Sequence, residues 1–291
     1  MRKNIEKVEV SRPSSNVIKL TVYTSTKSEA IMPIMFTADR HWDNPKSDRK
    51  LQIRHLERAR EEGALVVDVG DLFCAMQGKG DRRANKGDLR PEHDKPNYLN
   101  ALSQTSAEFF EPYADLFAVI SQGNHETSVI KHKEYDLTER LVHDLNRAGG
   151  NVQKGKYSGY IQVQFQSPHT SFSYLVYYNH GSGGGGPVTK GVIQTNRRAA
   201  FVADADLCVS GHIHESWLVE VMRERVDVRA ATTFIEPQYH LQLPTYKEEY
   251  THEGFHIEKG RPPKPLGAWM VYFCSVGLKK NTSRIEIKRL N

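Results

Sequence analysis

The stretch Leu116-Phe117-Ala118-Val119-Ile120-Ser121-Gln122-Gly123-Asn124-His125-Glu126 joins an apolar run to a polar turn. A short apolar run that stops at a glycine turn predicts a buried strand whose last residues reach the edge of a sheet. In open α/β sheets, ligands bind at that edge. Here the edge receives an amide, an imidazole and a carboxylate. The stretch therefore predicts a ligand site, provided that other strands end in the same way.

Four other predicted strands are also followed by aspartate or histidine. Residues 31–36 lead to Asp39 and His41, residues 64–69 to Asp71, residues 172–178 to His180, and residues 207–209 to His212 and His214. Because strand ends of one sheet converge on one crevice, we expect these side chains to meet although they are scattered along the chain.

The rest of the pattern indicates an α/β protein. Residues 31–69 read as strand, helix (50–62) and strand, hence as a parallel βαβ unit. Helical spacing recurs at 98–110, 136–147 and 189–200, and after residue 150 alternating patterns dominate. Further strands are expected at 17–25, 160–165, 217–221, 226–233, 269–276 and 284–288, with long loops at 72–97 and 237–267. Without a repeat or a low-complexity linker, we expect a single domain over 1–291, in which residues 215–291 complete a motif core at 31–214.

Composition excludes several classes of protein. With 38% hydrophobic and 26% charged residues, the chain resembles ordinary globular proteins. The net charge of +5 tolerates a phosphate-bearing substrate but does not indicate a dedicated nucleic-acid binder. The three cysteines are far apart and predict neither a disulfide framework nor a zinc ribbon. The charged N-terminus lacks the apolar core of a signal peptide, and no apolar run has the length of a membrane span. We therefore expect a cytoplasmic protein without a membrane partner.

The residues at the strand ends predict a metal site. All of the candidate ligands offer nitrogen or oxygen, a set that suits Mn²⁺, Fe, Zn²⁺ or Ni²⁺. Eight groups exceed the needs of one ion but suffice for two ions with a carboxylate between them. Such a pair lowers the pKa of a bound water and clamps a phosphoryl group, while an imidazole outside the coordination sphere supplies a proton to the leaving group.

The order D-x-H, G-D, G-N-H-E, N-H-G, G-H-x-H between residues 31 and 214 resembles the calcineurin-like metallophosphoesterase superfamily. The resemblance implies a two-sheet α/β/β/α sandwich with mixed sheets and two divalent ions, with Mn²⁺ favoured. It also implies a residue set: Asp39, His41, Asp71 and His214 around one metal; Asp71, Asn124, His180 and His212 around the other; and His125 as the catalytic histidine that binds no metal.

The substrate is left more open. The sequence Gly70-Asp71-Leu72-Phe73 resembles the DNA-repair exonuclease branch, although that branch usually has aspartate where this chain has Glu126. Phosphoprotein phosphatases continue as G-D-x-x-D-R-G, which this chain lacks. We expect a nuclease or nucleotide phosphodiesterase. The alternatives are a phosphomonoesterase, a metal-bearing scaffold like the phosphoesterase-fold subunit of retromer, and a nucleic-acid-binding module.

Several nearby residues have less decisive patterns. Asp68 is expected to be structural, whereas Asp43, Cys74 and Glu126 are candidates for orienting metal-bound imidazoles. The basic loop containing Arg82, Arg83 and Lys86 is a candidate for substrate binding, although solvated surface is the simpler interpretation. The glycine run 183–186 fits either a phosphate-binding turn or a flexible loop.

Overall fold

Two mixed β-sheets pack face to face in the computed structural model, which describes residues 1–25, 28–77, 84–186, 188–228, 230–251 and 255–291. The six-stranded sheet has the order β13 (Lys279–Leu290), β12 (Ala268–Val276), β3 (Glu29–Thr37), β4 (Leu65–Asp68), β5 (Phe117–Ile120) and β6 (Gln153–Lys154). The strands β3 to β6 are parallel, whereas β12 and β13 are antiparallel to their neighbours.

The seven-stranded sheet is assembled mainly from the second half of the chain. Its order is β1 (Lys7–Ser14), β2 (Val17–Tyr23), β7 (Ser158–Gln166), β8 (Ser171–Asn179), β9 (Leu207–Ser210), β11 (Thr232–Gln242) and β10 (Trp217–Asp227). The pair β7–β8 is an antiparallel hairpin, and β8, β9 and β11 run parallel to one another.

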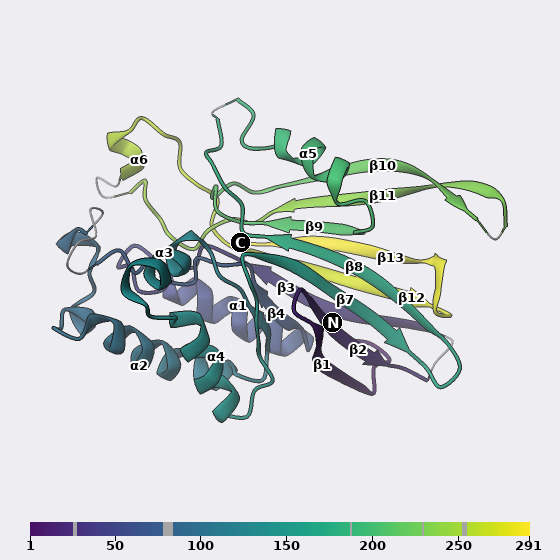
Figure 1. Ribbon diagram of the computed structural model, residues 1–291, viewed down its shortest axis with the longest axis horizontal. Coiled ribbons are helices and arrows are strands. Elements are labelled where there is room, and N and C mark those ends of the chain that lie inside the picture. Colours follow the sequence, from purple (N-terminus) through teal and green to yellow (C-terminus); the bar gives the residue numbers. More distant parts are fainter. Residues whose placement is uncertain (26–27, 78–83, 187, 229, 252–254) are drawn as a thin grey trace.

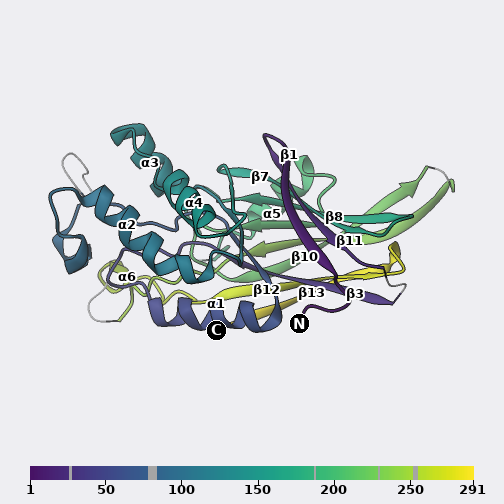
Figure 2. The ribbon, with the colours of Figure 1, turned by 90° about the horizontal axis from the view of Figure 1, so that it is seen from below.

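Helices cover the outer faces of both sheets. On the six-stranded sheet lie α1 (Arg49–Glu62), α2 (Tyr98–Phe110) and α4 (Leu137–Arg147), with α3 (Asn124–Lys133) at the end of the strands (Figure 1). On the other side α5 (Ile193–Phe201) covers the seven-stranded sheet, and the view at right angles shows α1 and α5 on opposite sides of the strands (Figure 2). The fourth layer is therefore thin, and the predicted α/β/β/α sandwich is confirmed.

Strand alternation explains why there are two separate cores. In β4, Val67 points into the core between the sheets, whereas its neighbour Val66 packs under the helices. The core between the sheets also contains Val163 and Phe273, one from each sheet. A strand that is buried on both faces reads as a continuous apolar run, which is why β3, β4 and β5 were evident in the sequence.

The helices begin and end where local signals place them. The side chain of Asp48 caps α1 by accepting from the Leu51 backbone N–H at 2.8 Å, and Gly63 ends this helix with a φ of 63°. Asp136 caps α4 in the same way at 2.9 Å from the Glu139 backbone N–H. Among the described residues, no helix is long and apolar enough to cross a bilayer.

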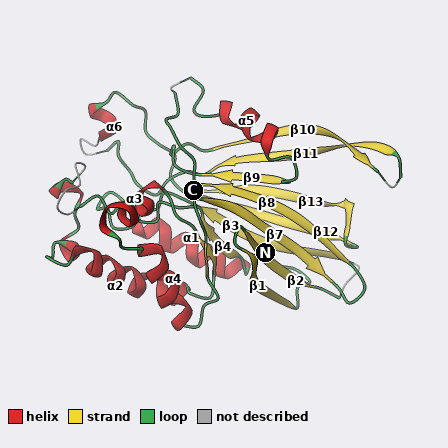
Figure 3. Ribbon diagram, in the orientation of Figure 1, coloured by secondary structure: helices red, strands yellow, loops and turns green. Residues whose placement is uncertain are grey.

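The region after β9 differs from the sequence expectation. The strand expected at 226–233 spans a turn, because β10 and β11 form one long hairpin that projects beyond the other strands (Figure 3). Strand β10 continues through the charged residues 223–225, and Arg223 pairs across the strands with Glu236 at 3.0 Å. Charge is well placed on β10 because it is an edge strand.

The loop expected at 237–267 begins later than predicted, because β11 continues to Gln242. Pro237 suggested that no strand was present, since proline lacks the N–H that a central strand needs. Pairing of β11 with β9 begins only at Tyr239, so Pro237 is paired on one side, with Met222. Four short elements complete the described regular structure outside the sheets and large helices: the 3₁₀ helices at Lys86–Asp88, Pro91–His93 and Glu111–Tyr113, and α6 (Phe255–Glu258).

Candidate metal centre

The candidate ligands gather where five strands end. Asp39 and His41 follow β3, Asp71 follows β4, and Asn124 opens α3 after β5. His180 follows β8 and His212 and His214 follow β9, so residues of both sheets contribute. Figure 1 shows the strands converging near the centre of the molecule, where the helical end begins. The structure thus brings together all the side chains that the sequence singled out as ligands.

The backbone at these strand ends is unusual. Five of the candidate ligands have left-handed φ angles: Asp39 (50°), His41 (41°), Asp71 (53°), His212 (74°) and His214 (54°). Residues other than glycine seldom adopt this conformation, and it persists only where the surroundings hold it. Backbone hydrogen bonds between the loops do so, from Asp39 N–H to Gly70 O (2.9 Å) and from His41 N–H to Asp71 O (3.0 Å). Such strain clusters at functional sites.

Asp39, His41 and His214 form a first group whose ligand atoms lie within 4.8 Å of one another. His214 Nε2 is 3.3 Å from both Asp39 Oδ1 and His41 Nε2. One oxygen of Asp39 accepts from the His212 backbone N–H at 2.8 Å, whereas Oδ1 is buried without a hydrogen-bond partner in the described part of the chain. An unpaired buried carboxylate oxygen facing two ring nitrogens suits a cation between them.

Asp71, His180 and His212 form a second group with the same spacing limit. His180 Nε2 lies 3.1 Å from Asp71 Oδ2 and 3.2 Å from Asn124 Oδ1. His212 Nδ1 lies 2.7 Å from the same Asn124 oxygen. The second nitrogen of His180 is oriented by the backbone carbonyl of Val69 at 2.9 Å. The four side chains are therefore arranged as candidates for a second cation.

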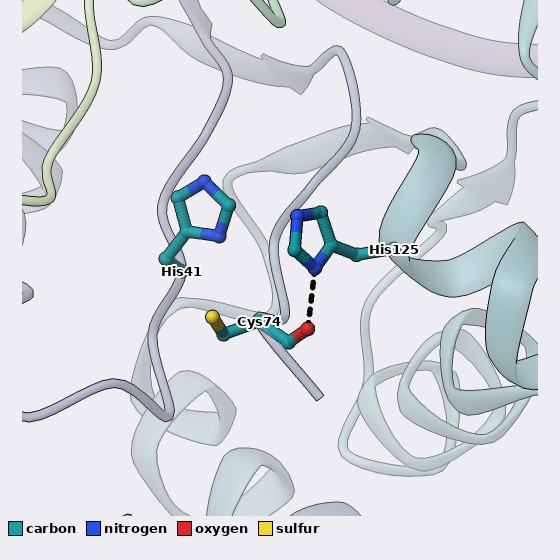
Figure 4. Close-up of side chains that lie close together, drawn as sticks. All are labelled: His41, Cys74 and His125. Carbon is teal, nitrogen blue, oxygen red and sulfur yellow. Dashed lines mark hydrogen bonds between the residues drawn. The ribbon is translucent and has the colours of Figure 1, made fainter. Parts of the chain in front are cut away.

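His125 lies beside these groups and is more exposed than most of them, with 12% of its side chain accessible. Its Nδ1 is 2.5 Å from the backbone carbonyl of Cys74, drawn as the dashed line in Figure 4. Its Nε2 is 3.7 Å from Asp71 Oδ2. The carbonyl fixes the ring so that Nε2 faces the second group.

Charges in the second group reinforce one another. Burial lowers the pKa of His180, but the Asp71 carboxylate outweighs this effect and raises that pKa to about 10. Burial likewise opposes ionisation of Asp71, yet His180 and His125 bring its pKa well below the usual range. Asp71 is therefore charged, which is the form that binds a cation.

Two acidic residues next to the ligands accept hydrogen bonds from the backbone. Glu126 accepts from the backbone N–H groups of Gly123 and Phe73, both at 2.8 Å. Asp43 accepts from the N–H of Cys74 at 2.5 Å and from that of Ala75 at 2.9 Å. Their role is to shape the loops that carry the ligands. The imidazoles themselves are oriented by backbone carbonyls, which sequence patterns do not reveal.

Asp68 is structural, as the sequence predicted. It is fully buried and accepts from Arg40 Nε at 2.7 Å and from the Thr37 hydroxyl at 2.9 Å. Arg40 stands between the ligands Asp39 and His41 and is itself inaccessible to solvent. The sequence reading missed Arg40, because nothing in its local pattern distinguishes a buried guanidinium from an exposed one.

Two glycines in the motifs are required by close approach to the ligands. A Cβ at Gly211 would lie 2.8 Å from Asp39 Oδ2 and 2.6 Å from the Ala38 side chain. A Cβ at Gly123 would lie 2.7 Å from Asp71 Cγ. Their φ angles do not require glycine, so here the lack of a side chain matters more than backbone freedom.

The loop after β11 also supports the site. The hydroxyl of Thr245 donates to the backbone carbonyl of Asp39 at 2.8 Å, and the Tyr246 N–H reaches the same oxygen at 3.1 Å. Lys247 follows, with only 7% of its side chain exposed and Glu249 at 2.7 Å. This loop lies far along the sequence from Asp39, so only the fold shows its contribution.

The candidates for substrate binding are less informative. Arg82 and Arg83 lie outside the described residues, and Lys86 is exposed. His240 is buried and hydrogen-bonded to Gln238 at 3.0 Å, away from the two groups, as expected for a structural histidine. All three cysteines are free and buried.

Comparison with known proteins finds likeness in structure. No protein-family model and no curated protein sequence match the chain. A putative 5'-nucleotidase from Staphylococcus aureus is 12% identical with a TM-score of 0.45, over 89% of this chain and 53% of the nucleotidase chain, so this chain spans about half of it. Zinc-bound Vps29 from Entamoeba histolytica is 10% identical with a TM-score of 0.36, over 89% and 100% of the two chains. A predicted phosphoesterase from Streptococcus pneumoniae is 11% identical with a TM-score of 0.30, over 89% and 99%.

At such low similarity the argument rests on the topology and the site of this chain. The five motif blocks occur in order, each at the end of a strand, and they meet where two mixed sheets come together. This arrangement agrees with the two-sheet sandwich and the residue set that the resemblance implies.

Proposed function

We propose that this protein is a metal-dependent phosphoesterase with two divalent transition-metal ions. In this proposal Asp39, His41, Asp71 and His214 hold one ion. Asp71, Asn124, His180 and His212 hold the other, and Asp71 bridges the two. Mn²⁺ is the favoured metal, and Fe, Zn²⁺ or Ni²⁺ also suit nitrogen and oxygen ligands.

One observation carries the proposal: two separate groups of donors, each within 4.8 Å, lie side by side at the strand ends. The unpaired Oδ1 of Asp39 and the 3.3 Å approach of the His41 and His214 nitrogens fit a missing cation better than a finished hydrogen-bond network. Both carboxylate oxygens of Asp68 accept hydrogen bonds, as expected of a structural residue. Oδ1 of Asp39, by contrast, has no hydrogen-bond partner in the described part of the chain.

Bound ions would lower the pKa of a water and neutralise charge on the phosphoryl group. The chain's own contribution is orientation and proton transfer. Cys74 O and Val69 O fix the rings of His125 and His180, so that each presents Nε2 to the centre. A protonated His125 would give its Nε2 proton to the leaving oxygen. The Asp71 carboxylate lies 3.7 Å from that nitrogen.

The proposed substrate is a phosphodiester, in a nucleic acid or a nucleotide. The resemblance of residues 70–73 to the exonuclease branch supports this choice, and the chain's mild positive charge is compatible with it. A phosphomonoester is the second candidate, because the same centre would serve either ester. Arg82 and Arg83 are proposed to contact substrate.

The test is a substrate panel with Mn²⁺-loaded protein whose metal content has been measured. Bis-p-nitrophenyl phosphate, p-nitrophenyl phosphate, cyclic nucleotides, and single- and double-stranded DNA are compared. We expect about two ions per chain and faster hydrolysis of diesters than of monoesters. Faster hydrolysis of the monoester would indicate a phosphatase instead of a diesterase. Two bound ions with no hydrolysis would favour the scaffold, and no bound ion would refute the centre itself.

Neutralising the basic loop separates an enzyme from a nucleic-acid-binding module. In the variant Arg82→Gln/Arg83→Gln/Lys86→Gln, an enzyme keeps hydrolysis of the small p-nitrophenyl ester, because its reacting centre is intact. If the protein instead bound nucleic acid through the loop without being an enzyme, the variant would lose its affinity for DNA. In that case neither the wild type nor the variant would hydrolyse the small ester.

A further inference from the structure

A third group of potential ligands lies beside the two already described. His41, Cys74 and His125 each offer one atom within 4.8 Å of the others. They come from the loops after β3 and β4 and from the first turn of α3, and Figure 4 shows their side chains facing one another. Cys74 adds a thiol, a kind of donor that the proposed pair of metal sites does not use.

The second ring nitrogen of His41 indicates that this space can take a ligand. His41 is 2% exposed, and its Nε2 faces His214 at 3.3 Å. Its Nδ1 is buried and has no hydrogen-bond partner in the described part of the chain. A metal-bound imidazole nearly always donates through its other nitrogen. Figure 4 shows this nitrogen on the side of the ring that faces His125 and Cys74.

The sulfur of Cys74 is held in place. Cys74 is 3% exposed, and its backbone N–H donates to Asp43. Its Sγ accepts a hydrogen bond from the Asn44 amide at 3.5 Å. The two other cysteines lie inside strands, Cys208 in β9 and Cys274 in β12. Among the described residues, Cys74 is therefore the cysteine that has two imidazoles nearby.

One thiolate and two imidazoles form a donor set for a soft or borderline cation. Zn²⁺ binds sulfur and nitrogen at about 2.3 and 2.0 Å, so ligands of one tetrahedral ion lie about 3.5 Å apart. The three atoms lie within 4.8 Å of one another, so side-chain rotation has to bring them closer by at most about 1.3 Å. Thiolate disfavours Mn²⁺ and Mg²⁺, so the donor set also discriminates between metals.

We propose that Cys74, His41 and His125 form an inhibitory site for a soft divalent cation such as Zn²⁺ or Cd²⁺. Binding uses Cys74 Sγ, His41 Nδ1 and one nitrogen of His125, with the thiol proton and the His41 Nδ1 proton released to solvent and water in the fourth position. The inhibitory effect rests on the proposed function, because the cation occupies His125, the proposed general acid. The binding itself does not.

The experiment is a Cd²⁺ titration of the full-length, Mn²⁺-loaded protein. Thiolate bound to Cd²⁺ absorbs in the ultraviolet, whereas cadmium on nitrogen and oxygen ligands does not. We expect this absorption to saturate at one equivalent, to vanish in Cys74→Ala and to persist in the control Cys208→Ala. Turnover at saturation should fall about 100-fold, the usual contribution of a general acid, and much less in Cys74→Ala relative to its own uninhibited rate.

Two results would overturn the proposal. Absence of the absorption from a folded wild-type protein would show that the thiolate does not bind the cation. Equal loss of turnover in wild type and Cys74→Ala would show that Cd²⁺ acts by replacing Mn²⁺. The near-isosteric Cys74→Ser, checked by circular dichroism, covers the case in which the alanine variant misfolds. Because the absorption needs no substrate, it tests the site even if the substrate panel shows no hydrolysis.

Discussion

At the scale of single residues, position and chemistry are set by different parts of the chain. Asp39, His41 and Asp71 supply donor atoms, but their left-handed backbone is held by hydrogen bonds between loops. A side chain of the right type is thus insufficient, because the strained turn must be held by its neighbours.

His125 provides the sharpest test of roles among these residues. In His125→Asn we expect turnover to fall about 10²- to 10⁴-fold, as is typical when a general acid is lost, while metal content stays at the wild-type value. His143→Asn is the matched control, because His143 is an exposed histidine on the neighbouring helix α4. Metal analysis and steady-state kinetics decide the result. Loss of metal from the variant would make His125 a ligand instead.

The pair Arg40–Asp68 provides a test of stability. Both side chains are fully buried and 2.7 Å apart, so Asp68→Asn leaves the guanidinium without its charged partner. We expect a loss of about 3–5 kcal/mol in the free energy of unfolding, measured by urea denaturation of metal-free protein. Glu61→Gln removes the exposed partner of Arg58 and should cost less than about 1 kcal/mol. Equal small losses would show that Arg40 finds sufficient partners in Gln52 and Thr37.

At the scale of elements, α3 changes the meaning of the G-N-H-E stretch. The sequence suggested a turn, but Asn124 and His125 are the first residues of a helix. Only Glu126 and Val129 of this helix are buried. It therefore lacks the regularly spaced apolar residues from which the sequence predicts α2 and α4. Glu126 closes its first turn by accepting from the Gly123 N–H.

Gly123 joins this helix to Asp71, and its replacement should disturb the second group of ligands. In Gly123→Ala the added Cβ would meet Asp71 Cγ at 2.7 Å, so either Asp71 or the helix start must move. We expect about 10- to 100-fold weaker Mn²⁺ binding, measured by calorimetry. Gly184→Ala is the control, because nothing lies within 4 Å of its Cβ position. Unchanged affinity in Gly123→Ala would mean that the site tolerates the displacement.

At the scale of the whole molecule, both groups of ligands join the two sheets. The first combines Asp39 and His41 from the six-stranded sheet with His214 from the seven-stranded one. The second combines Asp71 and Asn124 with His180 and His212 in the same manner. Bound ions would therefore link the halves of the sandwich at its helical end.

Metal binding should accordingly raise the thermal midpoint of unfolding. At a free Mn²⁺ concentration 100 times the Kd, each site adds about 2.7 kcal/mol. Asp71→Asn should lose more of this stabilisation than Asp39→Asn, since a bridging carboxylate serves two ions. The exposed Asp204→Asn should retain it. Calorimetric scans with and without Mn²⁺ measure these differences, and equal losses in the two ligand variants would contradict the bridge.

The sequence by itself determined the buried strands, the capped helices and the order of the polar strand ends, because these depend on neighbours within a few residues. It therefore predicted the layers of the fold and nominated every residue of the two ligand groups. Only the tertiary structure decided that Arg40 turns inward to Asp68 and that Thr245 supports Asp39. It also placed Pro237 in a strand and Cys74 beside two histidines. These features depend on contacts between segments far apart in the chain, which packing of the two sheets creates and no local pattern encodes.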